Sequence, residues 1–216
     1  MSASATSPAA SPSASPAATG LPPASESDLD ASLAAFGEVQ SLGLKEETSE
    51  AADGTNDERA KVTSGGAVCQ SFVDASAPYG PAYEASAEAD RAYDATTGDG
   101  PAVVQVAVVS HTSPAAARLT VEDARTSAKG CVHLTVNIDG STTKMNLAPI
   151  AEPTMGDDSA VVRAGTILAS ESTLVTMVVA QVGTETVHVL VASGKRYEIG
   201  FADEVVKELV PAVRIA

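Results

Sequence analysis

The chain of 216 residues carries 28 acidic and 13 basic side chains, which gives a formal net charge of −15. Such an acidic chain lacks the basic patch that phosphate groups require, so we expect no nucleic-acid partner and no attraction to anionic lipid. Hydrophobic residues make up 44% of the sequence but aromatic residues only 3%. We therefore expect a core of Val, Ala, Leu and Ile, which favours a sheet-rich fold of one domain with appendages.

Residues 1–26 are rich in Ser, Ala and Pro and cannot bury a core, so we expect a disordered tether. A tail of this kind commonly follows the lipid-modified cysteine of a bacterial lipoprotein. We therefore expect that Met1 replaces the end of a removed signal peptide. The alternative is a disordered terminus without a role. No apolar stretch of the sequence has the length of a signal peptide or a transmembrane helix.

Residues 27–216 are predicted to form one domain. Ser27 is expected to cap a first helix that ends at Gly37 and buries one apolar face. The acidic, glycine-broken stretch of residues 45–66 is predicted to be a solvated loop. Its segment DGTNDE suggests calcium, but an EF-hand loop needs glycine at its sixth position, where this segment has glutamate.

Residues 67–73 form a short apolar segment, and residues 82–95 form a weakly apolar stretch that we interpret as compatible with a helix. Three tyrosines fall in or beside this stretch of a sequence that is poor in aromatic residues. They are candidates to line a ligand groove, although tyrosines that simply pack in a core or at a rim are commoner. The three are Tyr79, Tyr83 and Tyr93.

Strand and helix signals dominate the second half of the chain. Residues 102–109 predict a strand, and Ser113-Pro114 begins a helix that ends at Gly130. Asp139-Gly140 predicts a hairpin turn whose two strands bury a single face. A further strand is expected over residues 160–169.

The most apolar stretch is residues 172–192, in which two β-forming runs meet at Gly183-Thr184. A strand that is apolar on both faces must be covered on both, so this hairpin is predicted to form the middle of the sheet. Asp203 is expected to cap a last helix, which Pro211 kinks or stops. Because helices do not alternate with the later strands, the order predicts an α+β fold, a single mostly antiparallel β-sheet packed against helices.

No motif for nucleophilic or phosphate chemistry occurs in the sequence, so we expect no catalytic residue, metal or cofactor. Two histidines could share the wetter face of neighbouring strands, although solvent-facing strand histidines without a role are commoner. Asp157-Asp158 is a candidate acid pair or simply solvates a loop. Arg163 could anchor an anionic ligand in a cleft, or it is salt-bridged or edge-exposed. The histidines are His111, His133 and His188, of which the last two form the candidate pair.

The chain has two cysteines, Cys69 and Cys131. They are two buried thiols in a cytosolic protein or one disulfide in a secreted protein. Metal binding is disfavoured because neither cysteine has enough further ligands at suitable spacing. A bridge would close a loop of roughly 60 residues, worth up to about 4 kcal/mol in the chain-entropy model.

Five stretches, taken in order, resemble the extracytoplasmic sensor domain of mycobacterial receptor Ser/Thr kinases and the related lipoproteins of actinobacteria. They are SDLDASLAAFG, AVCQSF, SPAAARLTVEDARTSAKGC, GDDSAVVRAGTILASES and ADEVVKELV. The resemblance implies an antiparallel sheet flanked by helices around a ligand cleft, and a helix-to-strand disulfide that maps onto Cys69 and Cys131. The kinase sensors have two disulfides and tryptophans, whereas this chain can form one disulfide and has no tryptophan, so the lipoprotein branch fits better.

We therefore expect a non-catalytic ligand-binding or sensing lipoprotein of the cell envelope. The alternative is a secreted protein-interaction module whose acidic N-terminal half contacts a partner; a hydrolase with an unrecognised site is a third possibility. The expected partner is a small molecule or an envelope protein, and the expected state is a monomer. Membrane contact is expected only through an N-terminal lipid anchor, which places the protein outside the cytoplasm, tethered to the outer face of the cell membrane or secreted.

Overall fold

The computed structural model describes residues 22–47, 61–76, 83–138, 141–151, 154–168, 171–194 and 196–215. The Ser/Ala/Pro-rich tail up to residue 21, the DGTNDE segment, Tyr79 and the turn residues Asp139-Gly140 lie outside these ranges. Within them, no helix combines the length and the apolar character that crossing a membrane requires.

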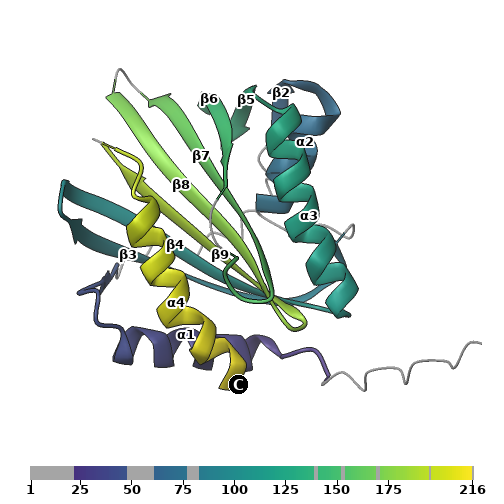
Figure 1. Ribbon diagram of the computed structural model, residues 1–216, viewed down its shortest axis with the longest axis vertical. Helices are drawn as coiled ribbons and strands as arrows, with labels where there is room; N and C mark the ends of the chain where they lie inside the picture. The colour runs from purple at the N-terminus through teal and green to yellow at the C-terminus, as the bar shows by residue number, and fades with distance from the viewer. Residues whose placement is uncertain are drawn as a thin grey trace, which may run out of the picture.

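The described residues form helices on both sides of one antiparallel sheet (Figure 1), which confirms the predicted α+β class. The helices are α1 (Glu26–Val39), α2 (Gly66–Ser76), α3 (Pro114–Gly130) and α4 (Ile199–Ile215). The strands are β1 (Lys45–Glu46), β2 (Lys61–Ser64), β3 (Ala85–Thr97), β4 (Gly100–His111), β5 (His133–Ile138), β6 (Ser141–Ile150), β7 (Asp158–Leu168), β8 (Glu171–Val182) and β9 (Glu185–Ser193). Their order in the sheet is β1-β3-β4-β9-β8-β7-β6-β5-β2.

The hairpin of β8 and β9 lies in the middle of this sheet, as predicted. Val182 pairs with Glu185 on either side of the Gly183-Thr184 turn, and β8 has four strands on each side. Val178 on one face and Val179 on the other are both buried. The hairpin is apolar at almost every position because helices cover both of its faces.

Alternating residues along the strands face two separate helix pairs, which Figure 1 shows at different sides of the sheet. On the first face, which we call the α4 face, residues such as Val104 and Val189 form a core with α1 and α4. On the second, the α2 face, Val162 and Val175 form a core with α2 and the end of α3. Because strand side chains alternate, the register between strands fixes which residues share a face.

The stretch of residues 82–95, which we interpreted as compatible with a helix, contributes most of strand β3 instead. From Ala85 onward it pairs with β4, and Ala89 and Tyr93 are buried on the α4 face. The acids Asp90 and Asp94 point to the opposite face, because they pair with Ala107 and Val103 of β4. Pairing with an apolar neighbour therefore overrides the helical preference of alanine and glutamate.

Two predicted helix starts also need correction. Ser25 caps α1, where its side chain accepts a hydrogen bond from the amide of Asp28 and the Asp28 carboxylate accepts one from the Ser25 amide. Ser27 is therefore inside the helix, and the helix continues past Gly37 to Val39. Similarly, α4 begins at Ile199 rather than after Asp203, and it continues through Pro211.

The stretch of residues 45–66 contributes two short edge strands, β1 and β2, rather than only a loop. The apolar segment of residues 67–73 is part of helix α2, on which Phe72 is buried. In contrast, the predicted start of α3 and its end at Gly130 are confirmed, and its residues Ala117, Ala124 and Ala128 are buried.

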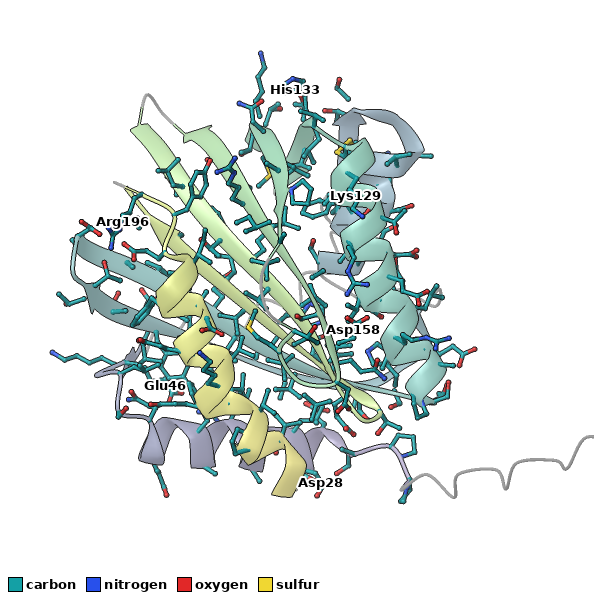
Figure 2. The ribbon with its side chains drawn as sticks, viewed as in Figure 1. Asp28, Glu46, Lys129, His133, Asp158 and Arg196 are labelled. Carbon is teal, nitrogen blue, oxygen red and sulfur yellow. A yellow bond between two sulfur atoms is a disulfide. The ribbon has the colours of Figure 1, made fainter. Side chains whose placement is uncertain are left out.

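A disulfide joins Cys69, in α2, to Cys131, the residue that caps the end of α3. Figure 2 shows this bond in yellow near the end of α3. Of the two alternatives that the sequence left open, the structure contains the bridge. It links a helix to a helix end, not a helix to a strand, because Cys131 lies two residues before β5.

Candidate ligand-binding cavity

The structure does not bring together the candidate ligand-binding residues that it describes, which are Tyr83, Tyr93 and Arg163. Tyr83 is buried beside α3, where its hydroxyl donates to Asp123 Oδ2 at 3.2 Å. Burial, followed by the nearby Asp123 carboxylate, raises the pKa of Tyr83 above its ordinary value. Tyr93 is buried on the other side of the sheet, with its ring edge-on to Phe36 at 5.9 Å between centroids. Tyr79 lies outside the described residues.

Arg163 lies exposed on the α4 face, with its guanidinium 5.6 Å from the ring centroid of Tyr197. It occupies the same row of the sheet as Tyr93, but four strands away, which corresponds to roughly 19 Å. A cation above an aromatic face is a stabilising arrangement on its own. The contribution of these tyrosines and of Arg163 to ligand binding stays a prediction.

The adjacent acids Asp157 and Asp158 have structural partners. Asp157 Oδ2 accepts a hydrogen bond from the Gly183 amide at 2.7 Å, which ties the loop to the central hairpin. Asp158 Oδ1 forms an ion pair with Arg125 of α3 at 2.5 Å. A hollow of about 480 Å³ lies beside this ion pair, and Figure 2 shows its lining residues Asp158 and Lys129. Its arginine is already neutralised by Asp158, so an anion would have to compete for it.

A cavity of about 380 Å³ lies on the α2 face, between α2 and the middle of the sheet. This volume falls within the range of small-molecule sites, which are mostly apolar with a few polar groups. Phe72 and Val73 of α2 form one wall, and Met177 and Leu190 of the central hairpin form the floor. Met145 of β6 also lines the cavity.

Three polar side chains of the sheet line the same cavity: Asp90, Gln105 and His188. Asp90 of β3 pairs with Ala107 of β4, and Ala107 pairs in turn with His188 of β9. Asp90, Ala107 and His188 therefore form one row across the α2 face. Asp90 and His188 flank a small residue, so no side chain larger than a methyl group separates them.

His188 is buried rather than solvent-facing, and its neighbour in space is His111, not His133. His111 Nε2 and His188 Nε2 each lie 2.9 Å from Thr186 Oγ1, and His111 Nδ1 lies 2.7 Å from the carbonyl oxygen of Tyr83. His133 is exposed on β5, where it contacts Asn146. The predicted pairing of His133 with His188 on neighbouring strands is therefore wrong, because β5 and β9 are separated by three strands.

Both buried histidines have lowered pKa values. Burial is the main cause at each, and it lowers the pKa of His188 to about 3 with a smaller contribution from the nearby His111. The backbone of Ser76, at the end of α2, has a smaller effect that raises the pKa of His188. However, Nδ1 of His188 forms no hydrogen bond of normal geometry within the described parts of the chain. Because both pKa values lie below the ordinary value of histidine, both rings are neutral at pH 7.

The hydrogen bonds fix which nitrogen of each ring carries the proton. A carbonyl oxygen can only accept, so His111 Nδ1 donates to Tyr83 and its Nε2 is a bare acceptor. The Thr186 hydroxyl then donates to His111 and accepts from His188 Nε2. In a neutral ring this leaves Nδ1 of His188 without a proton. That nitrogen is buried out of contact with solvent, near the backbone of Ser76, so it is not presented to a ligand in the cavity.

Sequence reasoning missed Asp90 and Gln105 and misjudged His188. The sequence signal that could have identified them is the alternation of small and acidic residues in ASAEADRAYDA, which has the period of a strand. Recognising that strand would have placed its acids beside the confirmed strand of residues 102–109.

Comparison with known proteins supports this fold. The crystal structure of the extracellular domain of PknH from Mycobacterium tuberculosis is similar, with a TM-score of 0.58. The match covers 90% of this chain and 98% of that chain, at 18% sequence identity. At this identity the likeness shows a shared fold alone. No family model matches the sequence, and no curated protein does either.

Proposed function

We propose that this protein is a non-catalytic, extracytoplasmic domain that binds a small ligand for sensing or delivery. The observation that carries the proposal is the cavity on the α2 face, which combines an apolar floor with the row of Asp90, Ala107 and His188. The shared fold with an extracellular domain supports it. The Cys69–Cys131 disulfide also supports it, because disulfides persist in oxidising compartments.

The finer proposal is a lipoprotein of the cell envelope. The composition of residues 1–26 supports a flexible spacer, which could hold the domain at up to about 75 Å from the membrane. The proposal predicts that the protein isolated from its natural host carries a lipid-modified cysteine at its N-terminus. Intact-mass spectrometry of detergent-extracted protein tests this, and an unmodified, freely secreted chain would leave only the ligand-binding proposal standing.

Binding in the cavity can be tested with N-phenyl-1-naphthylamine, a neutral dye that fluoresces in apolar sites. Ala107 lies at the centre of the cavity row, so Ala107→Leu places extra volume in the cavity. Ala148→Leu is the matched control, because Ala148 pairs with Arg163 and so lies on the α4 face. We expect the dye to bind, Ala107→Leu to weaken it at least about tenfold, and Ala148→Leu to leave it unchanged. Absence of dye binding, or an equal effect of both variants, would contradict the proposal.

A further inference from the structure

We propose that the ligand of this cavity is an amphiphilic cation, whose ammonium group lies beside the exposed Asp90 and whose apolar part lies on the floor of the hairpin. This inference rests on the proposed function and names the chemical class of its ligand. Two independent features of the cavity carry it: its apolar floor and the sign of its charge.

The floor of the cavity requires an apolar ligand body. Met177 and Leu190 pair with each other across the two central strands, and both remain partly exposed. Phe72 and Val73 face them from α2. Large side chains in the middle of a sheet are normally covered, as the same hairpin is on its α4 face. A chain of methylene groups would complete this layer by removing the floor from water.

The charge of the cavity favours a cation. Asp90 forms no ion pair or hydrogen bond with another residue in the described ranges, whereas its neighbour Arg91 pairs with Asp30 and Glu46 on the α4 face. Among the described residues that line the cavity, Asp90 carries the only formal charge at pH 7. The carboxylate therefore attracts an ammonium group and repels a carboxylate or phosphate.

Calorimetric titration with three ligands of equal chain length tests this inference. Decylamine, 1-decanol and decanoate are compared at pH 7.5, each below its aggregation concentration. We expect decylamine to bind at least about tenfold more tightly than decanol, and decanoate to bind more weakly than decanol. Equal binding of decylamine and decanol overturns the cationic specificity but leaves the cavity as a ligand site. Binding of neither overturns the proposed function as well.

A pair of variants separates the local carboxylate from the overall negative charge of the chain. Asp90→Asn should reduce the affinity for decylamine about five- to tenfold and leave that for decanol unchanged. Glu204→Gln removes the same charge from an exposed site on α4, beyond the opposite face, and should have no comparable effect. An equal loss in both variants would show general electrostatic attraction and overturn the inference. Circular dichroism confirms that each variant is folded.

Discussion

Cys69 and Cys131 tie the middle of α2 to the end of α3 across 62 residues of chain. Closing a loop of this length removes conformational freedom from the unfolded chain, worth about 4 kcal/mol in the chain-entropy model. We expect the double variant Cys69→Ala/Cys131→Ala to lose about that much free energy of unfolding in urea titrations. The unmodified chain with reductant serves as the control and should approach the variant. A double variant as stable as the oxidised protein would contradict this account.

The two buried histidines predict a loss of stability in acid. Their folded pKa values lie below the ordinary value near 6.5, so below that pH the unfolded chain binds protons that the folded chain does not. The free energy of unfolding therefore falls as pH decreases from about 7 to 5.5, by up to about 1.4 kcal/mol per pH unit for each histidine. Most carboxylates remain ionised in this window.

Urea titrations at several pH values check this slope. His188→Gln removes one titrating group, so its slope should be smaller than that of the unmodified chain, whatever its absolute stability. His133→Gln is the control, because His133 is exposed and outside the buried pair. If the slope of His188→Gln matches that of the control, the assignment of the acid sensitivity to His188 is wrong.

Replacement of Gly156 by any larger residue is predicted to destabilise the fold. Its φ is +64°, and a Cβ added there would overlap the carbonyl oxygen of Gln181 at the end of β8. Gly156→Ala should therefore cost at least about 2 kcal/mol of stability. Gly43 also has a positive φ, of +70°, but open space around it, so Gly43→Ala should cost only about 1 kcal/mol. Thermal unfolding that ranks the two variants in the opposite order would show that the contact with Gln181 relaxes easily.

Tyr83 is predicted to matter for stability through its hydroxyl. Tyr83→Phe removes the hydrogen bond to Asp123 and should cost about 1 kcal/mol in urea titrations. The raised pKa gives a second measurement, because Tyr83 should ionise at higher pH than a free tyrosine. Ultraviolet absorbance during alkaline titration should lose this late-ionising component in Tyr83→Phe. An unchanged titration curve would place the hydroxyl in water.

The central hairpin could be predicted from sequence because its residues are apolar on both faces, a pattern that few other structures produce. The α3 helix could be predicted because Ser113-Pro114 and Gly130 mark its ends chemically. The capping serine of α1 was predicted two residues too late, because Ser25 and Ser27 offer the same chemistry. Only the position of Asp28 decides between them.

The candidate site could not be predicted because it depends on strand β3. Alanine, glutamate and aspartate suit a helix or a loop, and only pairing with β4 makes this segment a strand. The tyrosines were selected because aromatic residues are rare in the sequence. The burial of Tyr83 and Tyr93 depends on α3 and α1, which are distant from them in sequence. The lipid anchor and the alternative role as a protein-interaction module stay predictions.

Strand β3 is 13 residues long, and of the described residues only Lys45, Glu46 and the amide of Glu47 bond to its outer side. A long strand at a sheet border offers amide and carbonyl groups to any second strand that approaches. Glu88, Asp90 and Asp94 recur along this border, so two copies of the chain meeting there would bring carboxylates together. These acids, of which Asp90 also lines the cavity, therefore disfavour association of two copies through this sheet border, and this effect should weaken in acid as they become protonated.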